Sequence, residues 1–84
     1  YSLYDFNLTC ENAVAIMELI RRLADEQRAL ITRIHIQGRK GDKPEIRFRA
    51  NFSGANSLDR VQNFFSVLQQ NEQVIYVTLD RQWI

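Results

Sequence analysis

The sequence predicts an α+β domain with the element order β-α-β-β-α-β, and two patterns predict it. In four stretches apolar side chains alternate with polar ones, as in strands that bury one face. In two stretches between them apolar residues recur at three-and-four spacing, as in amphipathic helices. Because strand-helix-strand crossovers are right-handed, both helices should cover the same face of a four-stranded antiparallel sheet. This is the ferredoxin-like arrangement.

The composition is that of one ordinary globular domain. The chain has 84 residues, 45% of them hydrophobic and 25% charged, and we expect a single domain over residues 1–84. Its formal net charge of +1 lacks the basic excess of a typical nucleic-acid-binding domain. The chain starts at Tyr1 and has no apolar run near the ~18 residues of a membrane helix. Because the sequence begins at Tyr1 and not at a methionine, we expect a domain excised from a larger protein.

The first predicted strand leads directly into the first predicted helix. The inner face of the strand is formed by Tyr4, Phe6, Leu8 and Cys10. After these residues the period changes, and Asn12 or Thr9 can cap the helix. The apolar stripe of the helix contains Ala13, Ile16, Met17, Ile20, Leu23 and Ala24.

The second strand is predicted to start at Leu30. Its alternation predicts that one side faces the core, formed by Leu30, Thr32, Ile34 and Ile36. The opposite side carries Arg33, His35 and Gln37. Residues 38–44 contain two glycines and the only proline, and they predict a hairpin tip.

The third strand, residues 45–53, has the strictest alternation in the chain. Its inward side is predicted to contain Ile46, Phe48, Ala50 and Phe52, and its outward side Arg47, Arg49 and Asn51. The second helix follows, capped by Asn56 or Ser57. Its apolar positions are Leu58, Val61, Phe64, Phe65 and Leu68. The β-branched residues of 74–79 predict the last strand.

In this fold the first and third strands lie at the centre of the sheet. The floor of the core is then formed by Phe6, Leu8, Phe48, Ala50 and Phe52. Its roof is formed by Ile16, Met17, Ile20, Phe64 and Leu68. Burial of these large side chains stabilises the fold, so the aromatic residues predict a core and not a cofactor pocket.

No helix is expected on the other face of the sheet. This face is predicted to carry Asp5, Asn7, Thr9, Arg33, His35, Gln37, Arg47, Arg49, Asn51, Tyr76, Thr78 and Asp80. A protein partner, or a second copy of the chain, is expected to bind this face or a free sheet edge. The residues that we assign to such a partner surface are Arg33, His35, Arg47, Arg49 and Tyr76.

RNA-recognition modules share this element order, but they stack bases on aromatic residues that point outward from the central strands. Here the outward positions of the third strand hold Arg47, Arg49 and Asn51. Basic residues, including Arg33, Arg39, Lys40 and Lys43, remain available for phosphate contacts. The alternative, which we favour, is a solvated face whose arginines pair with Asp5 and Asp80. We expect no nucleic-acid partner.

Catalysis and metal binding have little support in the sequence. His35 is the only histidine, and Cys10, the only cysteine, falls on the apolar side of its strand. Ser53 and Ser57 have no evident base beside them, and carboxylates are scattered. We predict a non-enzymatic domain without a metal or cofactor.

The fold class also resembles the ACT domains, small sensors with the same element order. Those that bind amino acids have a glycine-containing loop after the first strand, where backbone amides approach the ligand. This chain has Thr9-Cys10-Glu11-Asn12-Ala13 there, without glycine or proline. The resemblance therefore predicts an ACT-like fold, and amino-acid sensing is a less favoured function.

A more specific resemblance covers nearly the whole chain. Tyr1-Ser2-Leu3-Tyr4 leading to Leu8-Thr9-Cys10, then Glu45-Ile46-Arg47, then Val74-Ile75-Tyr76-Val77-Thr78-Leu79-Asp80, is similar to the C-terminal domain of the MgtC/SapB family. The resemblance implies an ACT-like domain on the cytosolic side of a bacterial inner-membrane protein, after a hydrophobic helical region. Members of the family are associated with growth at low magnesium and survival inside host cells.

A second family gives the alternative. Scaffold proteins of the PilN type, from pilus and secretion assemblies, carry ferredoxin-like domains after one membrane helix. Those domains are periplasmic and dimerise. Several hydrophobic helices before Tyr1 would indicate the MgtC-like protein, and one helix the PilN-type protein.

Overall fold

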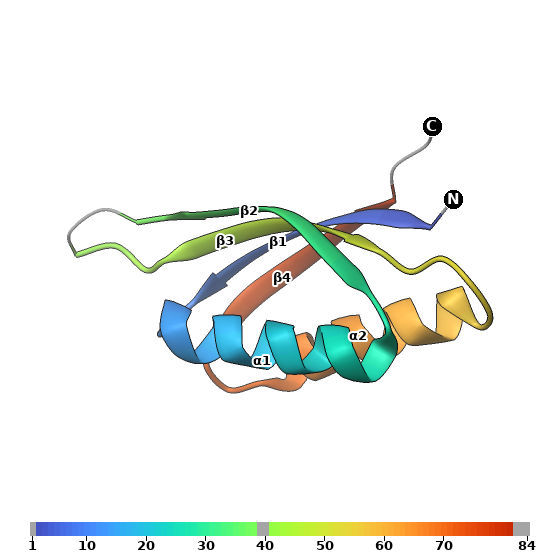
Figure 1. Cartoon of the computed structure of the whole chain (residues 1–84). Coiled ribbons are helices and arrows are strands. Elements are labelled where there is room, and N and C mark those ends of the chain that lie inside the picture. The colour runs from blue at the N-terminus through green and yellow to red at the C-terminus, as the bar shows by residue number, and fades with distance from the viewer. Residues whose placement is uncertain (1, 39–40, 82–84) are drawn as a thin grey trace.

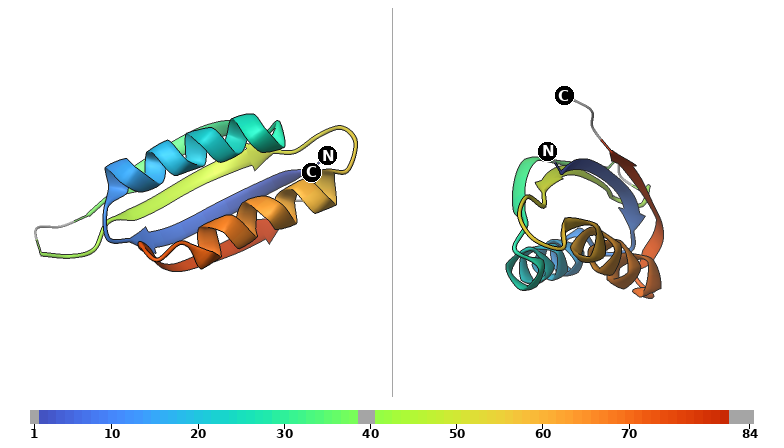
Figure 2. Two further views of the ribbon diagram at one scale, coloured as in Figure 1. Left: turned by 90° about the horizontal axis from the view of Figure 1, so that it is seen from below. Right: turned by 90° about the vertical axis from the view of Figure 1, so that its right-hand side faces the viewer.

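The computed structural model describes residues 2–38 and 41–81. The elements follow in the order β1 (Leu3–Cys10), α1 (Ala13–Gln27), β2 (Leu30–Gln37), β3 (Glu45–Asn51), α2 (Ser57–Gln70) and β4 (Val74–Arg81) (Figure 1). The strands form one antiparallel sheet in the order β2-β3-β1-β4, so β1 and β3 lie at its centre. Both helices cover the same face of the sheet (Figure 2). The predicted ferredoxin-like fold is confirmed, and Arg39 and Lys40 of the hairpin tip lie outside the described residues.

The core lies between the sheet and the helices and is built around four phenylalanines. Phe6 of β1 stacks on Phe48 of β3 with ring centroids 4.9 Å apart. Phe64 of α2 packs against both rings and meets Phe52 edge-on at 5.5 Å. These four side chains are buried, so the inward side predicted for the third strand is confirmed.

The ends of the two helices differ in how they are capped. Asn12 precedes α1, and its Oδ1 atom accepts a hydrogen bond from the backbone N–H of Ala15 at 3.1 Å, as predicted. Asn56 precedes α2, but its backbone is left-handed, with φ of 58°, and its side chain makes no capping hydrogen bond. The predicted capping oxygen of α2 was therefore wrong.

The second strand departs from the predicted alternation. Thr32 pairs with Arg49 and His35 with Arg47, so two residues, Arg33 and Ile34, lie opposite Phe48. This is a β-bulge, and Arg33 adopts a left-handed backbone with φ of 54°. An extra residue reverses the alternation on one side of the bulge.

The bulge corrects the predicted positions of Leu30 and Thr32. Leu30 pairs with Asn51, and its side chain is 64% exposed. Ile31, which pairs with buried Ala50, is the inward residue of this part of β2. Beyond the bulge the prediction holds, because Ile36 pairs with buried Ile46.

Two predicted core residues lie at the margins of their helices. With 3.6 residues per turn, Leu58 is about 120° around α2 from Phe64, and Met17 is about 100° around α1 from Ile16. Leu58 is consequently exposed and Met17 only half-buried, whereas Leu19, absent from the predicted stripe, is buried. No helix among the described residues is long and apolar enough to cross a membrane.

Arg60 is buried although its charge predicts exposure. Arg60 lies one turn after the start of α2. Its guanidinium lies between the end of α1, the end of β3 and the start of α2. It donates five hydrogen bonds of 2.7–3.2 Å to the backbone carbonyls of Ala55, Gln27, Arg28, Phe52 and Ser53. One side chain therefore joins three segments of the chain.

The thiol of Cys10 is predicted to be unreactive. Burial raises its pKa above the ordinary 9.0, a hydrogen bond from the Asn12 backbone opposes this, and the Glu11 charge adds to it. A raised pKa means that the folded chain retains the thiol proton at pH 8, whereas the unfolded chain is partly thiolate. We expect an aromatic disulfide reagent to modify folded Cys10 at least about tenfold more slowly than the chain in denaturant. Equal rates at pH 8 would contradict the buried position.

Candidate functional site

The candidate site is the outer sheet face, which we define as the side of the sheet turned away from the helices. Strand pairing sets its side chains in rows that cross the sheet from β2 to β4. The row nearest the middle contains His35, Arg47, Asn7 and Thr78. The next row contains Thr32, Arg49, Asp5 and Asp80.

Charge is divided unequally across these rows. The cations Arg33, Arg47 and Arg49 come from β2 and β3, whereas Asp5 and Asp80 come from β1 and β4. The outer sheet face is therefore basic on one side and acidic on the other.

Two of the arginines are already paired. Arg49 donates to both carboxylate oxygens of Asp5, at 2.8 and 3.2 Å, and these hydrogen bonds raise the pKa of the guanidinium. Arg47 donates from Nε to Glu45 at 2.9 Å. The pairing of Arg49 with Asp5 confirms part of the predicted solvated face.

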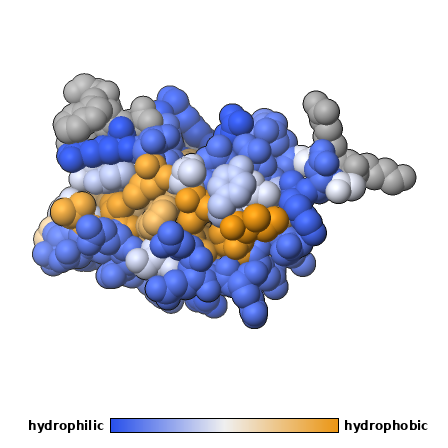
Figure 3. Space-filling view, turned by 180° about the vertical axis from the view of Figure 1, so that it is seen from behind, coloured by the Kyte–Doolittle hydropathy of each residue, from blue (hydrophilic) through white to orange (hydrophobic). Residues whose placement is uncertain are grey.

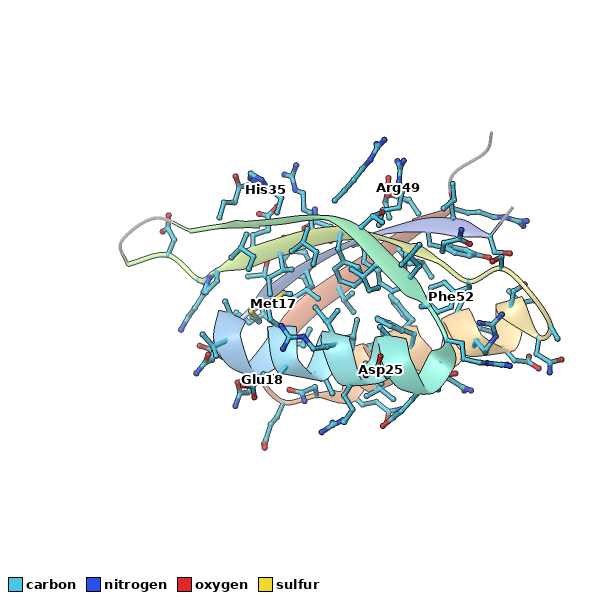
Figure 4. The ribbon with its side chains drawn as sticks, in the orientation of Figure 1. Met17, Glu18, Asp25, His35, Arg49 and Phe52 are labelled. Carbon is cyan, nitrogen blue, oxygen red and sulfur yellow. The ribbon has the colours of Figure 1, made fainter. Side chains whose placement is uncertain are left out.

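Four of the five predicted partner-surface residues come together. Arg33, His35, Arg47 and Arg49 line one open cavity of about 530 Å³ on the outer sheet face. Figure 4 shows His35 and Arg49 pointing away from the helices on the same side of the sheet. Tyr76 does not line this cavity; it pairs with Thr9 in a row nearer the end of the face.

The same cavity contains a residue that the prediction did not single out. Asn7 lies on central strand β1, and its Oδ1 atom is buried without a hydrogen-bond partner among the described residues. The bulge that carries Arg33 was also missed. Its signal in the sequence is the spacing of Ile31, Ile34 and Ile36, where a step of three interrupts the steps of two.

The two edges of the sheet are also open. At the β2 edge, Ile34 and Ile36 face inward but remain 48% exposed, because α1 only partly covers them. Met17 and Ile20 of α1 and Ile31 and Ile34 of β2 line a small cavity there, of about 200 Å³. The bulge at Arg33 interrupts this edge.

The β4 edge is more regular, with one bulge at Ile75 near its start. From Tyr76 to Arg81, strand β4 pairs with β1 without interruption. Figure 3, the view from behind Figure 1, shows a band of apolar side chains across the side where β4 and α2 lie. Phe65, Val77 and Leu79 of these elements are half-buried, and Ile75 is 49% exposed.

Comparison with known proteins finds likeness in structure and not in sequence. No family model matches the chain, and no curated protein matches it. The structure is similar to the solution structure of the C-terminal domain of the MgtC protein from Mycobacterium tuberculosis, with a TM-score of 0.81. Sequence identity is 11%, over 96% of this chain and 87% of that one. The chain has the fold of that MgtC domain.

Other solved structures with a similar fold include an ACT domain. The ACT domain of GTP pyrophosphokinase from Chlorobium tepidum matches with a TM-score of 0.70 and 13% identity, over 94% of this chain and 97% of that one. A homoserine dehydrogenase from Thiobacillus denitrificans matches with a TM-score of 0.77 and 12% identity. The match covers 95% of this chain but 17% of the enzyme. The predicted ACT-like, MgtC-like fold is thus confirmed, and at these identities the likeness concerns the fold alone.

Proposed function

We propose that this chain is the non-catalytic interaction domain of an MgtC-like protein of the bacterial inner membrane. The observation that carries the proposal is the similarity to the MgtC C-terminal domain over 96% of the chain. The sequence resemblance at Leu8-Thr9-Cys10 and along β4 supports the same family. The domain then lies on the cytosolic side of the membrane, in a protein concerned with growth at low magnesium and survival in host cells.

The described side chains support an interaction domain over an enzyme. The only thiol, on Cys10, is buried in the core with a raised pKa. Arg49 is held by Asp5, and Arg47 by Glu45. What the chain presents to solvent is an open sheet face and two open sheet edges, features that bind other protein surfaces.

We assign the interaction to the β4 edge and expect it to join two copies of the chain. An edge strand offers unpaired N–H and C=O groups, and β4 does so over an uninterrupted length. The apolar band beside it, with Ile75 and half-buried Val77 and Leu79, supplies surface for two copies to cover. The β2 edge is less suited, because the bulge at Arg33 divides it into two stretches of three paired residues.

A charged residue at the β4 edge is predicted to prevent this association. In light scattering over rising concentration, the unmodified domain should form dimers. Ile75→Lys should raise the dimer dissociation constant by at least about tenfold, because a buried lysine at an edge opposes pairing. The matched control is Val14→Lys, an exposed apolar residue on α1 away from β4. A strict monomer at millimolar concentration, or equal effects of the two variants, would contradict the assignment.

The PilN-type scaffold domain remains the second candidate, because a free β4 edge suits its dimers equally. The two proteins differ upstream of this domain. Several hydrophobic helices in the full-length chain support the MgtC-like protein and a cytosolic domain. One helix supports the periplasmic scaffold.

A further inference from the structure

The cavity on the outer sheet face contains polar groups that the fold itself does not use. The side chains of Arg33, His35 and Asp80 make no hydrogen bond or ion pair with the described residues. The Oδ1 atom of Asn7 is buried without a donor. All four residues line the same cavity of about 530 Å³, which is within the usual size range of ligand sites.

Arg33 is placed in the cavity by the bulge in β2. Its backbone φ of 54° is left-handed, a conformation that glycine adopts more easily than arginine. Bulges change the direction of a side chain relative to the regular strand. Here Arg33 lines the cavity together with His35 and Arg47, on the basic side of the face.

The unused groups divide into donors and acceptors. Arg33 and His35 can donate to an anion over β2 and β3, where paired Arg47 and Arg49 add positive charge. Asp80 of β4 can accept hydrogen bonds, whereas the Oδ1 atom of Asn7 on β1 is buried from a ligand. Because β3 lies between β2 and β1, the backbone that carries Arg33 and His35 is two strand spacings, about 9.6 Å, from that of Asn7. Asp5 does not repel an anion strongly, since Arg49 pairs with it.

We propose that this cavity binds the phosphate group of a phosphate ester. The phosphate contacts the guanidinium of Arg33 and the ring of His35, because a planar guanidinium suits phosphate oxygens. This site is separate from the β4 edge, so it stands independently of the proposed function.

The chemistry occurs both in soluble phosphate esters and in phospholipid headgroups, and the test distinguishes them. The soluble probes are O-phosphoethanolamine and glycerol 3-phosphate, titrated while backbone amide shifts are recorded by NMR. The lipid arm measures sedimentation with vesicles of phosphatidylethanolamine and phosphatidylglycerol. Arg33→Gly removes the guanidinium and leaves a residue that favours the left-handed backbone of the bulge. Arg22→Gln, on exposed α1, is the control.

We expect saturable shifts at His35 and Arg47, with affinity at least about tenfold weaker in Arg33→Gly and unchanged in Arg22→Gln. Binding to the soluble probes identifies a free phosphate ester; binding to vesicles alone, lost in Arg33→Gly, identifies a headgroup. Absence of binding in both arms, or binding that Arg33→Gly leaves unchanged, would overturn the proposal.

Discussion

Replacing Arg60 with methionine is expected to lower the free energy of unfolding by about 3 to 5 kcal/mol. Arg60 is 6% exposed, and its guanidinium is the donor to five backbone carbonyls. Methionine retains the length of the side chain but has no donor, so these carbonyls lose their partner. Two of the carbonyls, those of Gln27 and Arg28, end α1, where a nearby positive charge is favourable. Urea unfolding followed by circular dichroism measures the change.

The matched control is Arg22→Met, because Arg22 lies on the exposed side of α1 and only approaches Glu26 at 3.8 Å. An exposed pair of this kind contributes little, so the control should stay within about 0.5 kcal/mol of the unmodified chain. Arg60→Lys should fall between the two, since one ammonium group cannot reach carbonyls on three segments. If Arg60→Met and Arg22→Met unfold at the same urea concentration, the contacts of Arg60 do not stabilise the fold.

Phe48→Ala is expected to destabilise the domain by a similar amount, roughly 3 to 5 kcal/mol. The ring of Phe48 is buried and stacks on that of Phe6, with ring centroids 4.9 Å apart. Its centroid lies 6.0 Å from that of Phe64. Alanine removes apolar area from the centre of the core and leaves a cavity that neighbouring rings fill only in part. For a domain of 84 residues this is a large share of the total stability, so the variant should be partly unfolded at 37 °C.

Arg47→Ala tests the other face of the same strand. Arg47 is half exposed and pairs with Glu45 two residues away, so its loss should change the free energy of unfolding by less than about 0.5 kcal/mol. The comparison depends only on which way neighbouring side chains of β3 point. Equal unfolding midpoints for Phe48→Ala and Arg47→Ala would show that the two faces of β3 are not distinct in stability.

Much of the fold follows from local patterns. The alternation in β1 and β3 predicts the inward positions of Phe6 and Phe48, because successive side chains of a strand point to opposite faces. The period of α1 and α2 predicts the burial of Ile20 and Phe64 in the same way. Element order with right-handed crossovers then gives the sheet topology. For the candidate site, this was enough to bring Arg33, His35, Arg47 and Arg49 to one face.

The remaining features depend on residues far apart in the sequence. The bulge at Arg33 is defined by how β2 pairs with β3, and a period-two pattern read along one strand cannot place Leu30 correctly once the register shifts. Tyr76 stands apart from the cavity because the pairing of β4 with β1 sets its row.

Arg60 shows most clearly what local sequence patterns cannot predict. A lone arginine in a helix predicts a solvated side chain, because burying a charge is costly unless its donors are satisfied. Here they are satisfied by carbonyls of Gln27 in α1, of Phe52 after β3 and of Ala55 shortly before α2, which only the tertiary fold brings together. The sequence by itself determined which faces are apolar and the order of the elements, since these are properties of neighbouring residues. The tertiary structure decided the register of β2 and the partners of Arg60, since these depend on contacts between distant segments.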